Sequence, residues 1–588
     1  MPKKILVTTS LPRTWDSQKF MMFLGNWCQK NDNFSTLSKE NYKIFKYHWD
    51  DRNKLIKDYE YIKLLEKKIF ITLVNFLNDY HKKKFSQRYW KILLGPWLLT
   101  LLQIIFERYS NLKYFFEENK DEEIDTVILT KKNHLFTPNN FEEFLRYILT
   151  DTWNYFLYAD LINFEKFKFP VNKLFANFID EENYKSYLNL NYSKKNNFLS
   201  FISSLFEKIF GHQDVLISES YLGKFQELSF SLKLKSIPRY SQGVRFFKTK
   251  IDTENRSKNL NFETDNIFEQ FIKSNILKFI PKTFMEDFDL VNNYVNKMHW
   301  PKKPKVIFTS HFMQKTFQSR YVAECIEKND TKLIIGQHGG VYGQYLFSSM
   351  EDYELEICDK YLSWGRQNKS NKKIIPFGVI KNIRNLDYNK ENKDLLMILR
   401  SQTKYTHRIN SYSGTNQIKK YFSENIELCK KLNKEIVLNN LLLRFHARKF
   451  GWNEEGLFKK ELGTLRIDLG YKKINHLISK SKLVLQTYIG TGYLETLAYN
   501  IPTIIFANTD ECLIQPETIE DLNDLKRNNI FFDNKDLAAK FINEKWNDIN
   551  SWWFDPSTQK ARKEFCLKYS NINPEKNDQL FKIIESLK

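Results

Sequence analysis

Three groups of residues in this sequence have the types and spacing to bind phosphate or to move a proton. The first is the run Gly490, Thr491 and Gly492, which lies between an apolar segment and a stretch of good helix formers. Main-chain N–H groups at the start of a helix, together with the helix dipole, favour an anion there, so this run suits a phosphate. Glu495 follows one turn later, where its carboxylate could accept a hydrogen bond from a ribose hydroxyl. The alternative is an ordinary βα turn that needs glycine only for its geometry.

The second group is basic. In LLLRFHARKFGW, an apolar run is followed by Arg444, His446 and Arg448 at alternating positions, and such positions on a strand point to one side. This cluster suits a diphosphate or an acidic sugar, because guanidinium groups bind phosphate and carboxylate through paired hydrogen bonds. An exposed charge cluster on an edge strand is the alternative. Arg400 and Ser401, which end the run LLMILRS, are expected to extend the same rim.

The third group is GQHGG, in which His338 follows an apolar run of strand type and precedes two glycines. A histidine at such a place can act as a general base or a phosphate ligand, or can be a turn residue satisfied by main chain. We expect His338 to be the general base, with Asp16 in the first loop as its rival and His311 third. The same cleft is expected to include five further residues: Arg13, Gln337, Gly339, Gly340 and Tyr342.

The elements that must position these residues alternate between strand and helix. Residues 482–486 and 503–506 are predicted strands on either side of a helix at 493–499, which makes a βαβ unit and indicates a parallel sheet. Two series of such units predict an α/β protein with two Rossmann-like domains that face a cleft. We expect an N-terminal domain, a second domain and closing helices, with a helical insertion in the first domain, at these bounds: 1–365, 366–540, 541–588 and, for the insertion, 138–300.

Composition narrows the class of protein. The 588 residues carry a formal net charge of +21, but the lysines are scattered among acidic residues, and no zinc-finger spacing or RNA-binding signature is present. We therefore expect no nucleic-acid partner and rank an anionic membrane surface second to an ordinary solvated surface. The six cysteines lie far apart, which is typical of reduced thiols in the cytoplasm. The apolar run 92–106 is shorter than the ~20 residues of a membrane span, so we expect a buried core helix.

Several reaction classes lack their motifs here. The sequence has no GxGxxG turn, no Walker loop, no GxSxG elbow and no HExxH. One DxD-like run, Asp287 to Asp289, is a weak signal by itself. We therefore expect no metal ion and no cofactor.

The segment GTGYLETLAYNIPTIIF resembles the donor-binding segment of GT-B glycosyltransferases. A fuller set of motifs is similar to a family of transferases from bacterial O-antigen and surface-polysaccharide gene clusters, over nearly the whole chain: ILVTTSLPRTWD, RYWKILLGPWL, SIPRY, GQHGGVYG and SWGR. By this resemblance Glu495 contacts the ribose of a nucleotide-sugar, and Gly490 to Gly492 contact its phosphates. QHGG also resembles the HG element of capsule-synthesis and teichoic-acid polymerases, in which the histidine is catalytic, and this implies a catalytic His338.

The resemblance implies an inverting, metal-independent glycosyltransferase that moves a sugar from a nucleotide-sugar donor to a glycan or lipid-linked glycan acceptor. Such an enzyme is expected in the cytoplasm or on the inner face of the cell membrane. Two alternatives stay open. One is transfer of a polyol phosphate in the manner of teichoic-acid polymerases, and the other is a non-catalytic glycan-assembly protein of GT-B shape.

Overall fold

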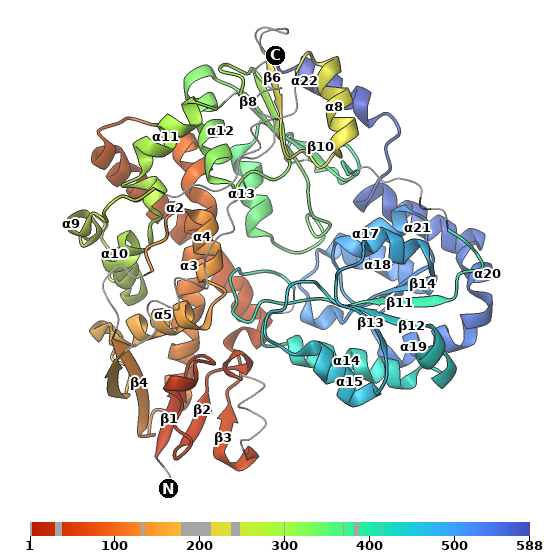
Figure 1. Cartoon of the computed structure of the whole chain (residues 1–588), viewed down its shortest axis with the longest axis horizontal. Coiled ribbons are helices and arrows are strands. Elements are labelled where there is room, and N and C mark those ends of the chain that lie inside the picture. The colour runs from red at the N-terminus through yellow and green to blue at the C-terminus, as the bar shows by residue number, and fades with distance from the viewer. Residues whose placement is uncertain are drawn as a thin grey trace.

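Three parallel β-sheets organise the chain in a computed structural model, and two long helices join them (Figure 1). The structure describes the following residues: 3–29, 38–130, 136–177, 213–236, 247–298, 300–368, 370–381, 386, 388–412 and 414–588. All strand pairs in the three sheets are parallel, so the predicted α/β class with Rossmann-like sheets is confirmed. Of the SIPRY motif only Ser236 lies within the described residues.

The first sheet has the strand order β3-β2-β1-β4-β5, and the second has the order β10-β9-β8-β7-β6. Most of their strands are short and apolar on both faces, which parallel strands need when helices cover both sides. The strands of the first sheet are β1 Lys4–Val7, β2 Phe20–Phe23, β3 Tyr42–Ile44, β4 Ile124–Thr130 and β5 Asn172–Asn177. Those of the second are β6 Val215–Ile217, β7 Val306–Thr309, β8 Lys332–Gly336, β9 Lys360–Ser363 and β10 Ile374–Pro376.

These two sheets correct the expectation for the first 365 residues. The region predicted as one Rossmann-like unit contains two separate five-stranded sheets, and the region 138–300, predicted to be helical, supplies an edge strand to each of them. Strand β5 is mostly exposed and β6 has only three residues, so neither has the long apolar run of a buried strand amid the helix-like aromatic spacing around them. The division of the chain into domains at residue 365 stays a prediction.

The third sheet has the order β13-β12-β11-β14-β15-β16, so the sequence order of its parallel strands reverses between β11 and β14. In parallel sheets of this kind, ligands bind outside the carboxyl ends of the strands at such a switch point. Its strands are β11 Asp394–Ile398, β12 Leu441–Arg444, β13 Arg466–Asp468, β14 Ser481–Gln486, β15 Thr503–Phe506 and β16 Phe531–Phe532. The predicted βαβ unit is confirmed, with α17 at Thr491–Ala498 between β14 and β15.

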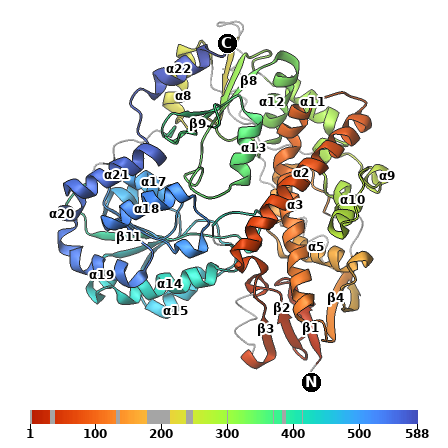
Figure 2. The same ribbon diagram turned by 180° about the vertical axis from the view of Figure 1, so that it is seen from behind.

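The helices follow the strands in alternation, apart from a helical layer around α2 and α3. Figure 2 shows these two long helices between the first and second sheets, and the side chain of Arg52, at the start of α2, donates to the carbonyl of Glu511 in the segment after β15. The helices before β11 are α2 Arg52–His81, α3 Gln87–Glu118, α4 Phe141–Tyr147, α5 Asp151–Asn163, α8 Lys224–Lys233, α9 Thr253–Arg256, α10 Ile267–Phe279, α11 Phe288–Asn296, α12 Thr316–Asn329 and α13 Ser349–Ile357. Those after β11 are α14 Ile418–Lys431, α15 Glu454–Leu462, α16 Ile474–Ser479, α17, α18 Pro516–Arg527, α19 Lys535–Lys545, α20 Ile549–Trp553, α21 Pro556–Tyr569 and α22 Lys576–Glu585.

Helix α3 is a core helix, as predicted. Among the described residues it alone has the length and apolar composition to cross a membrane, but 94% of its most apolar window is buried inside the protein. Its Gly95-Pro96 pair has a specific packing partner in α13. Proline has no N–H for the carbonyl of Ile92 four residues earlier, and Oη of Tyr353 donates to that carbonyl at 3.1 Å. A β-carbon at Gly95 would lie 2.5 Å from the Tyr353 ring, so glycine is needed for this approach.

The C-terminal helices cross back from the third sheet to the second. The main-chain N–H of Asn571 donates to the carbonyl of Trp364, and the main-chain N–H of Val379 donates to the carbonyl of Asn571. These two bonds join the segment after α21 to the segments that follow β9 and β10 of the second sheet. Beyond this point Leu580 and Ile584 of α22 pack into the core beneath the second sheet. In Figure 1, α22 accordingly lies beside β6 and α8, far from α19 and α20.

Candidate functional site

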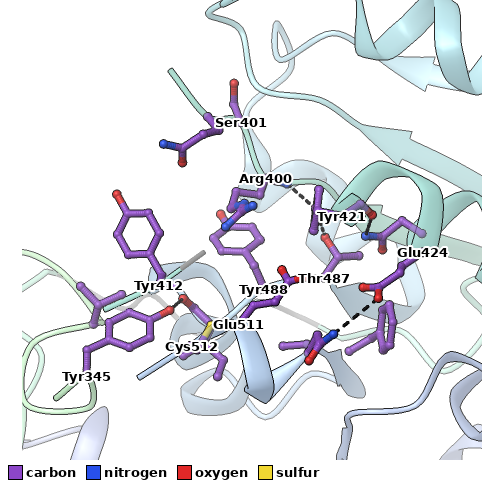
Figure 3. A pocket seen from close by; sticks show the side chains of 18 of the residues that line it. Tyr345, Arg400, Ser401, Tyr412, Tyr421, Glu424, Thr487, Tyr488, Glu511 and Cys512 are labelled. Carbon is purple, nitrogen blue, oxygen red and sulfur yellow. Dashed lines mark hydrogen bonds between the residues drawn. The ribbon is translucent and has the colours of Figure 1, made fainter. Parts of the chain in front are cut away.

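A cavity of about 290 Å³ lies at the carboxyl edge of the third sheet, at its switch point (Figure 3). Its walls come from the segments that follow β11, β14 and β15, from the first turns of α14, and from the loop after β8 of the second sheet. The lining residues are Val341, Tyr345, Arg400, Ser401, Gln402, Tyr412, Tyr421, Glu424, Asn425, Thr487, Tyr488, Ile489, Gly490, Thr491, Phe506, Ala507, Asn508, Glu511 and Cys512. A cavity therefore lies at the sheet edge where a ligand crevice was predicted, and the loop after β8 of the second sheet closes one side of it.

The GTG and QHGG motifs, 150 residues apart in the sequence, meet at this cavity. The N–H of Gly340 donates to Oγ1 of Thr491 at 3.0 Å. A β-carbon on Gly340 would lie 2.8 Å from Cα of Thr491, so this close approach requires glycine. Gly490 and Thr491 line the cavity at the start of α17, where its free N–H groups and its dipole favour an anion. Gly492 does not line the cavity, because a β-carbon on it would point toward the buried side chain of Gln486.

Arg400 and Ser401 line the cavity directly after β11, as their position at a strand end predicted. The N–H of Arg400 donates to Oη of Tyr421 at 2.7 Å, and its guanidinium lies 4.8 Å from the centre of the Tyr421 ring. This arrangement holds a cation and an aromatic face together at the carboxyl edge of the third sheet, where the cavity lies. Oγ of Ser401 has no hydrogen-bond partner within the described part of the chain.

Aromatic side chains form much of the remaining wall. Oη of Tyr345 donates to the carbonyl of Ile489 at 2.8 Å, and the Tyr345 and Tyr412 rings are 5.9 Å apart. Two further rings come from Tyr488, which follows β14, and from Phe506, the last residue of β15. Flat apolar faces of this kind beside a cation and a helix N-terminus suit a ligand that combines a planar ring with a phosphate.

His338 lies behind the cavity, at the carboxyl edge of the second sheet. Its Nδ1 is 3.5 Å from Oε1 of Glu354, its Nε2 is 3.3 Å from Oη of Tyr342, and its ring centre is 5.1 Å from that of His311. Glu354 is fully buried on α13 and accepts a hydrogen bond from Tyr342 at 3.3 Å. The loop that carries His338 reaches the cavity through Val341.

Burial controls the charge of this group. It lowers the pKa of His338 to about 3, helped by the nearby positive charges of His311 and Arg408. Burial, and then the charge of Glu351, raises the pKa of Glu354 well above its usual range. Near neutral pH the His338 imidazole is thus neutral and has a nitrogen that can accept a proton, and the raised pKa of Glu354 favours the uncharged form of its carboxyl.

The other predicted cleft residues have mixed placements. Gln337 is structural, because Nε2 donates to the carbonyl of Gly339 at 2.8 Å and Oε1 accepts from the N–H of Trp364 at 2.9 Å.

Asp16 and Arg13 lie in the loop between β1 and β2 of the first sheet. Lys19, 3.7 Å from Asp16, also pairs with Asp125 at the amino end of β4. This places Asp16 near the amino ends of strands in the first sheet, whereas His338 lies at the carboxyl edge of the second.

The basic cluster predicted after β12 does not line the cavity. Arg444 is the last residue of β12 and forms an ion pair with Asp468 of the neighbouring strand β13. His446 and Arg448 lie beyond the strand end and are exposed, and Nδ1 of His446 accepts from the N–H of Arg448. The alternation that seemed to align them was therefore not a strand pattern.

Glu495 is also engaged elsewhere. Its Oε1 accepts from Nζ of Lys381 at 2.7 Å, and its side chain is largely buried on α17 outside the cavity lining. Among the described residues, no group of three or more His, Cys, Asp or Glu side chains is arranged to hold a metal ion.

The sequence matches the LIC12162 family transferase description over residues 4–584. The chain belongs to the LIC12162 family of transferases. No curated protein sequence matches it significantly.

This LIC12162 family transferase is also distantly similar to solved structures. One is the UDP-GlcNAc 2-epimerase from Neisseria meningitidis bound to UDP-GlcNAc, with 10% identity, coverage of 63% of this chain and 99% of that chain, and a TM-score of 0.36. MurG of Acinetobacter baumannii has 9% identity, coverage of 63% and 99%, and a TM-score of 0.32. Arabidopsis thaliana UGT89C1 complexed with UDP has 11% identity, coverage of 66% and 95%, and a TM-score of 0.35. Likenesses this distant do not bear on the reaction or the substrate of the LIC12162 family member.

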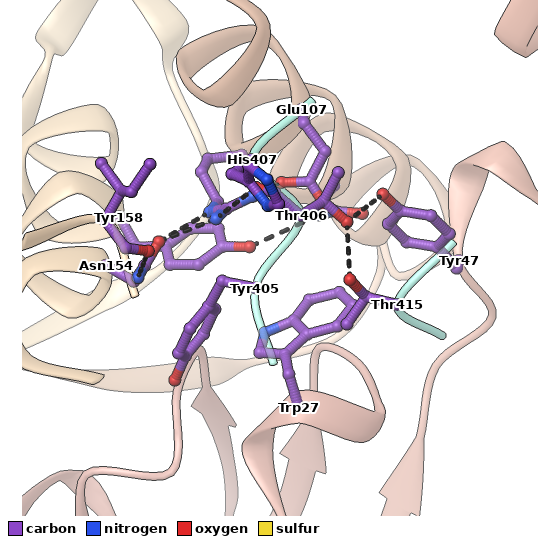
Figure 4. A network of polar contacts seen from close by, with 12 residues as sticks. Trp27, Tyr47, Glu107, Asn154, Tyr158, Tyr405, Thr406, His407 and Thr415 are labelled. Atoms are coloured by element: carbon purple, nitrogen blue, oxygen red, sulfur yellow. Dashed lines mark hydrogen bonds and ion pairs between the residues drawn. The ribbon is translucent and has the colours of Figure 1, made fainter. Parts of the chain in front are cut away.

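Sequence reasoning predicted Arg400 and Ser401 but missed residues 402–412 of the transferase, a segment that lines the cavity and then crosses to the first sheet and α3. Figure 4 shows Tyr405, Thr406 and His407 of this segment beside Glu107 and Asn154. The guanidinium of the buried Arg108 donates to the carbonyl of Thr406 at 2.9 Å. Tyr405 donates to Asp151 at 2.6 Å, and the N–H of Ile409 donates to Gln103 at 2.7 Å. One loop therefore ties the cavity to the N-terminal part of the protein. Its mixed polar sequence, SQTKYTHRIN, has no apolar periodicity that would indicate burial.

Also missed in the LIC12162 family transferase were the cavity residues of α14 and of the segment after β15. Tyr421, Glu424 and Asn425 lie on one side of α14, at the three- and four-residue spacing of a helix face. That spacing was a usable signal, but only once α14 was known to begin at the carboxyl edge of the sheet.

Proposed function

We propose that this LIC12162 family transferase is a glycosyltransferase of GT-B type that binds a nucleotide-sugar in the cavity of the third sheet. The single observation that supports it most is the combination in one cavity of the α17 N-terminus, Arg400 and several aromatic faces. The first two suit the diphosphate, and an aromatic ring suits a base. The resemblance of GTGYLETLAYNIPTIIF to a donor-binding segment agrees with this placement.

The proposed chemistry is a direct displacement. An acceptor hydroxyl attacks the anomeric carbon and passes its proton to the neutral His338, while the bond between that carbon and the phosphate oxygen breaks. The nucleotide leaves with the bonding electrons. The N–H groups at Gly490 and Thr491 and the guanidinium of Arg400 stabilise the negative charge that develops on it, without a metal ion. Such a single displacement inverts the anomeric centre.

The acceptor in this proposal is a bacterial surface glycan or its lipid-linked precursor, which approaches from the second sheet, where His338 lies. The net charge of +21 supports transfer at the inner face of an anionic membrane, with the protein in the cytoplasm.

The test is release of free nucleotide from UDP-, GDP-, CDP- and CMP-sugars in the presence of membrane glycolipid extracts. We expect one donor to be turned over, and Arg400→Ala to reduce kcat/KM for it by about tenfold or more, since a charge-assisted hydrogen bond contributes about 1.5–3 kcal/mol. If no donor is consumed by the folded wild type and a polyol-phosphate donor is, the glycosyltransferase proposal is wrong.

A further inference from the structure

One wall of the cavity consists of hydrogen-bond acceptors. Glu424 and Asn425 of α14 and Glu511, which follows β15, line the cavity together, and we call these three residues the carboxylate wall. Figure 3 shows Glu424 and Glu511 among the residues drawn around the cavity. An anionic ligand would not be expected to favour such a wall, so it must face a part of the ligand other than the phosphates.

The carboxylates have only partial compensation. Nζ of Lys420 lies 2.9 Å from Oε1 of Glu511 and 3.9 Å from Oε1 of Glu424, so the two carboxylates share one ammonium. Nδ2 of Asn508 donates to Glu424 at 3.4 Å. Burial raises the pKa of Glu424, and the negative charge of Glu511 raises it further. A ligand that donates hydrogen bonds to this wall would relieve the repulsion.

Asn425 provides an independent indication of a ligand. Its side chain is 1% exposed and lines the cavity, and Nδ2 donates to the carbonyl of Tyr421 at 2.8 Å. Oδ1 has no hydrogen-bond partner within the described residues. A buried carbonyl oxygen that lacks a partner is unfavourable, so a hydrogen-bond donor is expected to reach it.

The cavity is thus bipolar, with Arg400 and the start of α17 suited to phosphate and the carboxylate wall suited to hydroxyl or amino hydrogens. We propose that the carboxylate wall binds the transferred sugar through its hydroxyl or amino groups, so that the donor carries a neutral or amino sugar and not an acidic one. This inference rests on the proposed function. It differs from the acidic sugar that the basic cluster after β12 suggested, since Arg444 is paired with Asp468 outside the cavity.

The experiment measures affinities by calorimetry for UDP, UDP-glucose and UDP-glucuronate, and for GDP, GDP-mannose and GDP-mannuronate. We expect the neutral sugar nucleotide to bind at least about tenfold more tightly than the uronate, which would bring a second carboxylate to the wall. Glu424→Gln should weaken the neutral sugar nucleotide by about tenfold, as for loss of a charged hydrogen bond, and leave the bare nucleotide within about twofold. The same substitution should also reduce the difference in affinity between the neutral sugar nucleotide and the corresponding uronate.

The matched control is Glu427→Gln on the same helix, because Glu427 lies outside the cavity and pairs with Lys535. It should change none of these affinities. Equal weakening of bare and sugar-linked nucleotides by Glu424→Gln would assign the wall to the base and overturn the inference. Tighter binding of a uronate, or of CMP-N-acetylneuraminate, than of either neutral donor would overturn it too. Absence of any nucleotide binding would instead refute the proposed function.

Discussion

The hydrogen bond from Tyr353 to the carbonyl of Ile92 gives a sharp test of how α13 is held against α3. Tyr353 is 3% exposed, and its hydroxyl donates at 3.1 Å to a carbonyl that Pro96 leaves without its usual helical partner. Tyr353→Phe removes the donor and creates no new contact. A buried carbonyl left without a partner costs about 1–3 kcal/mol, so we expect the free energy of unfolding to fall by that amount.

A second substitution makes the test specific. Pro96→Ala supplies an N–H four residues after Ile92, so in that background the carbonyl has a donor of its own and Tyr353→Phe should cost less than about 1 kcal/mol. The measurement is a double-mutant cycle in urea, followed by tryptophan fluorescence, with an expected coupling of about 1–2 kcal/mol. Equal costs of Tyr353→Phe in both backgrounds would refute the reasoning and assign the loss to packing.

Four further predictions concern residues that the sequence analysis assigned to the site. His338→Ala should lower kcat by about 10²–10⁴ with donor affinity unchanged. Because the pKa of His338 is lowered to about 3, its proton-accepting form persists on acidification, so kcat/KM should stay level from pH 7 to 5, and an acid limb near pH 6.5 would contradict the buried neutral state. Arg444→Ala should lower stability by about 2–4 kcal/mol by leaving Asp468 unpaired, with nucleotide affinity unchanged in calorimetry. Glu495→Gln should leave nucleotide affinity within about twofold because Lys381 already occupies the carboxylate, and a tenfold loss would restore the ribose contact implied by the sequence resemblance.

The fold elements around the site could be predicted because their signals are local. Gly490 to Gly492 interrupt one apolar run, and Pro502 precedes the next, which is enough to define β14, α17 and β15. The apolar run before His338 likewise predicted β8. The short edge strands β5 and β6 have no such local signal, since they are strands only through their pairing with β4 and β7.

The site could be predicted only where a residue follows directly from a strand end. Arg400, two residues after β11, meets that condition, and Thr491 was indicated instead by the glycine-rich turn that starts α17; both line the cavity. Arg444 meets it as well, but Asp468, which pairs with it, lies on another strand, and no local pattern shows such a pair. Glu424 and Glu511 face the cavity through the docking of α14 and of the segment after β15, which depends on the whole third sheet.

The central claim is that the cavity of the third sheet binds a nucleotide, and Cys512 can report on it. Cys512 lines the cavity and is partly exposed, whereas the other five cysteines are buried. The rate of alkylation of Cys512 should therefore fall at least about tenfold in a saturating concentration of one of UDP, GDP, CDP or CMP, and Arg400→Ala should shift the protecting concentration upward about tenfold. Alkylation at an unchanged rate in all four nucleotides, in a protein whose Cys512 is labelled and whose fold is intact, would contradict the account.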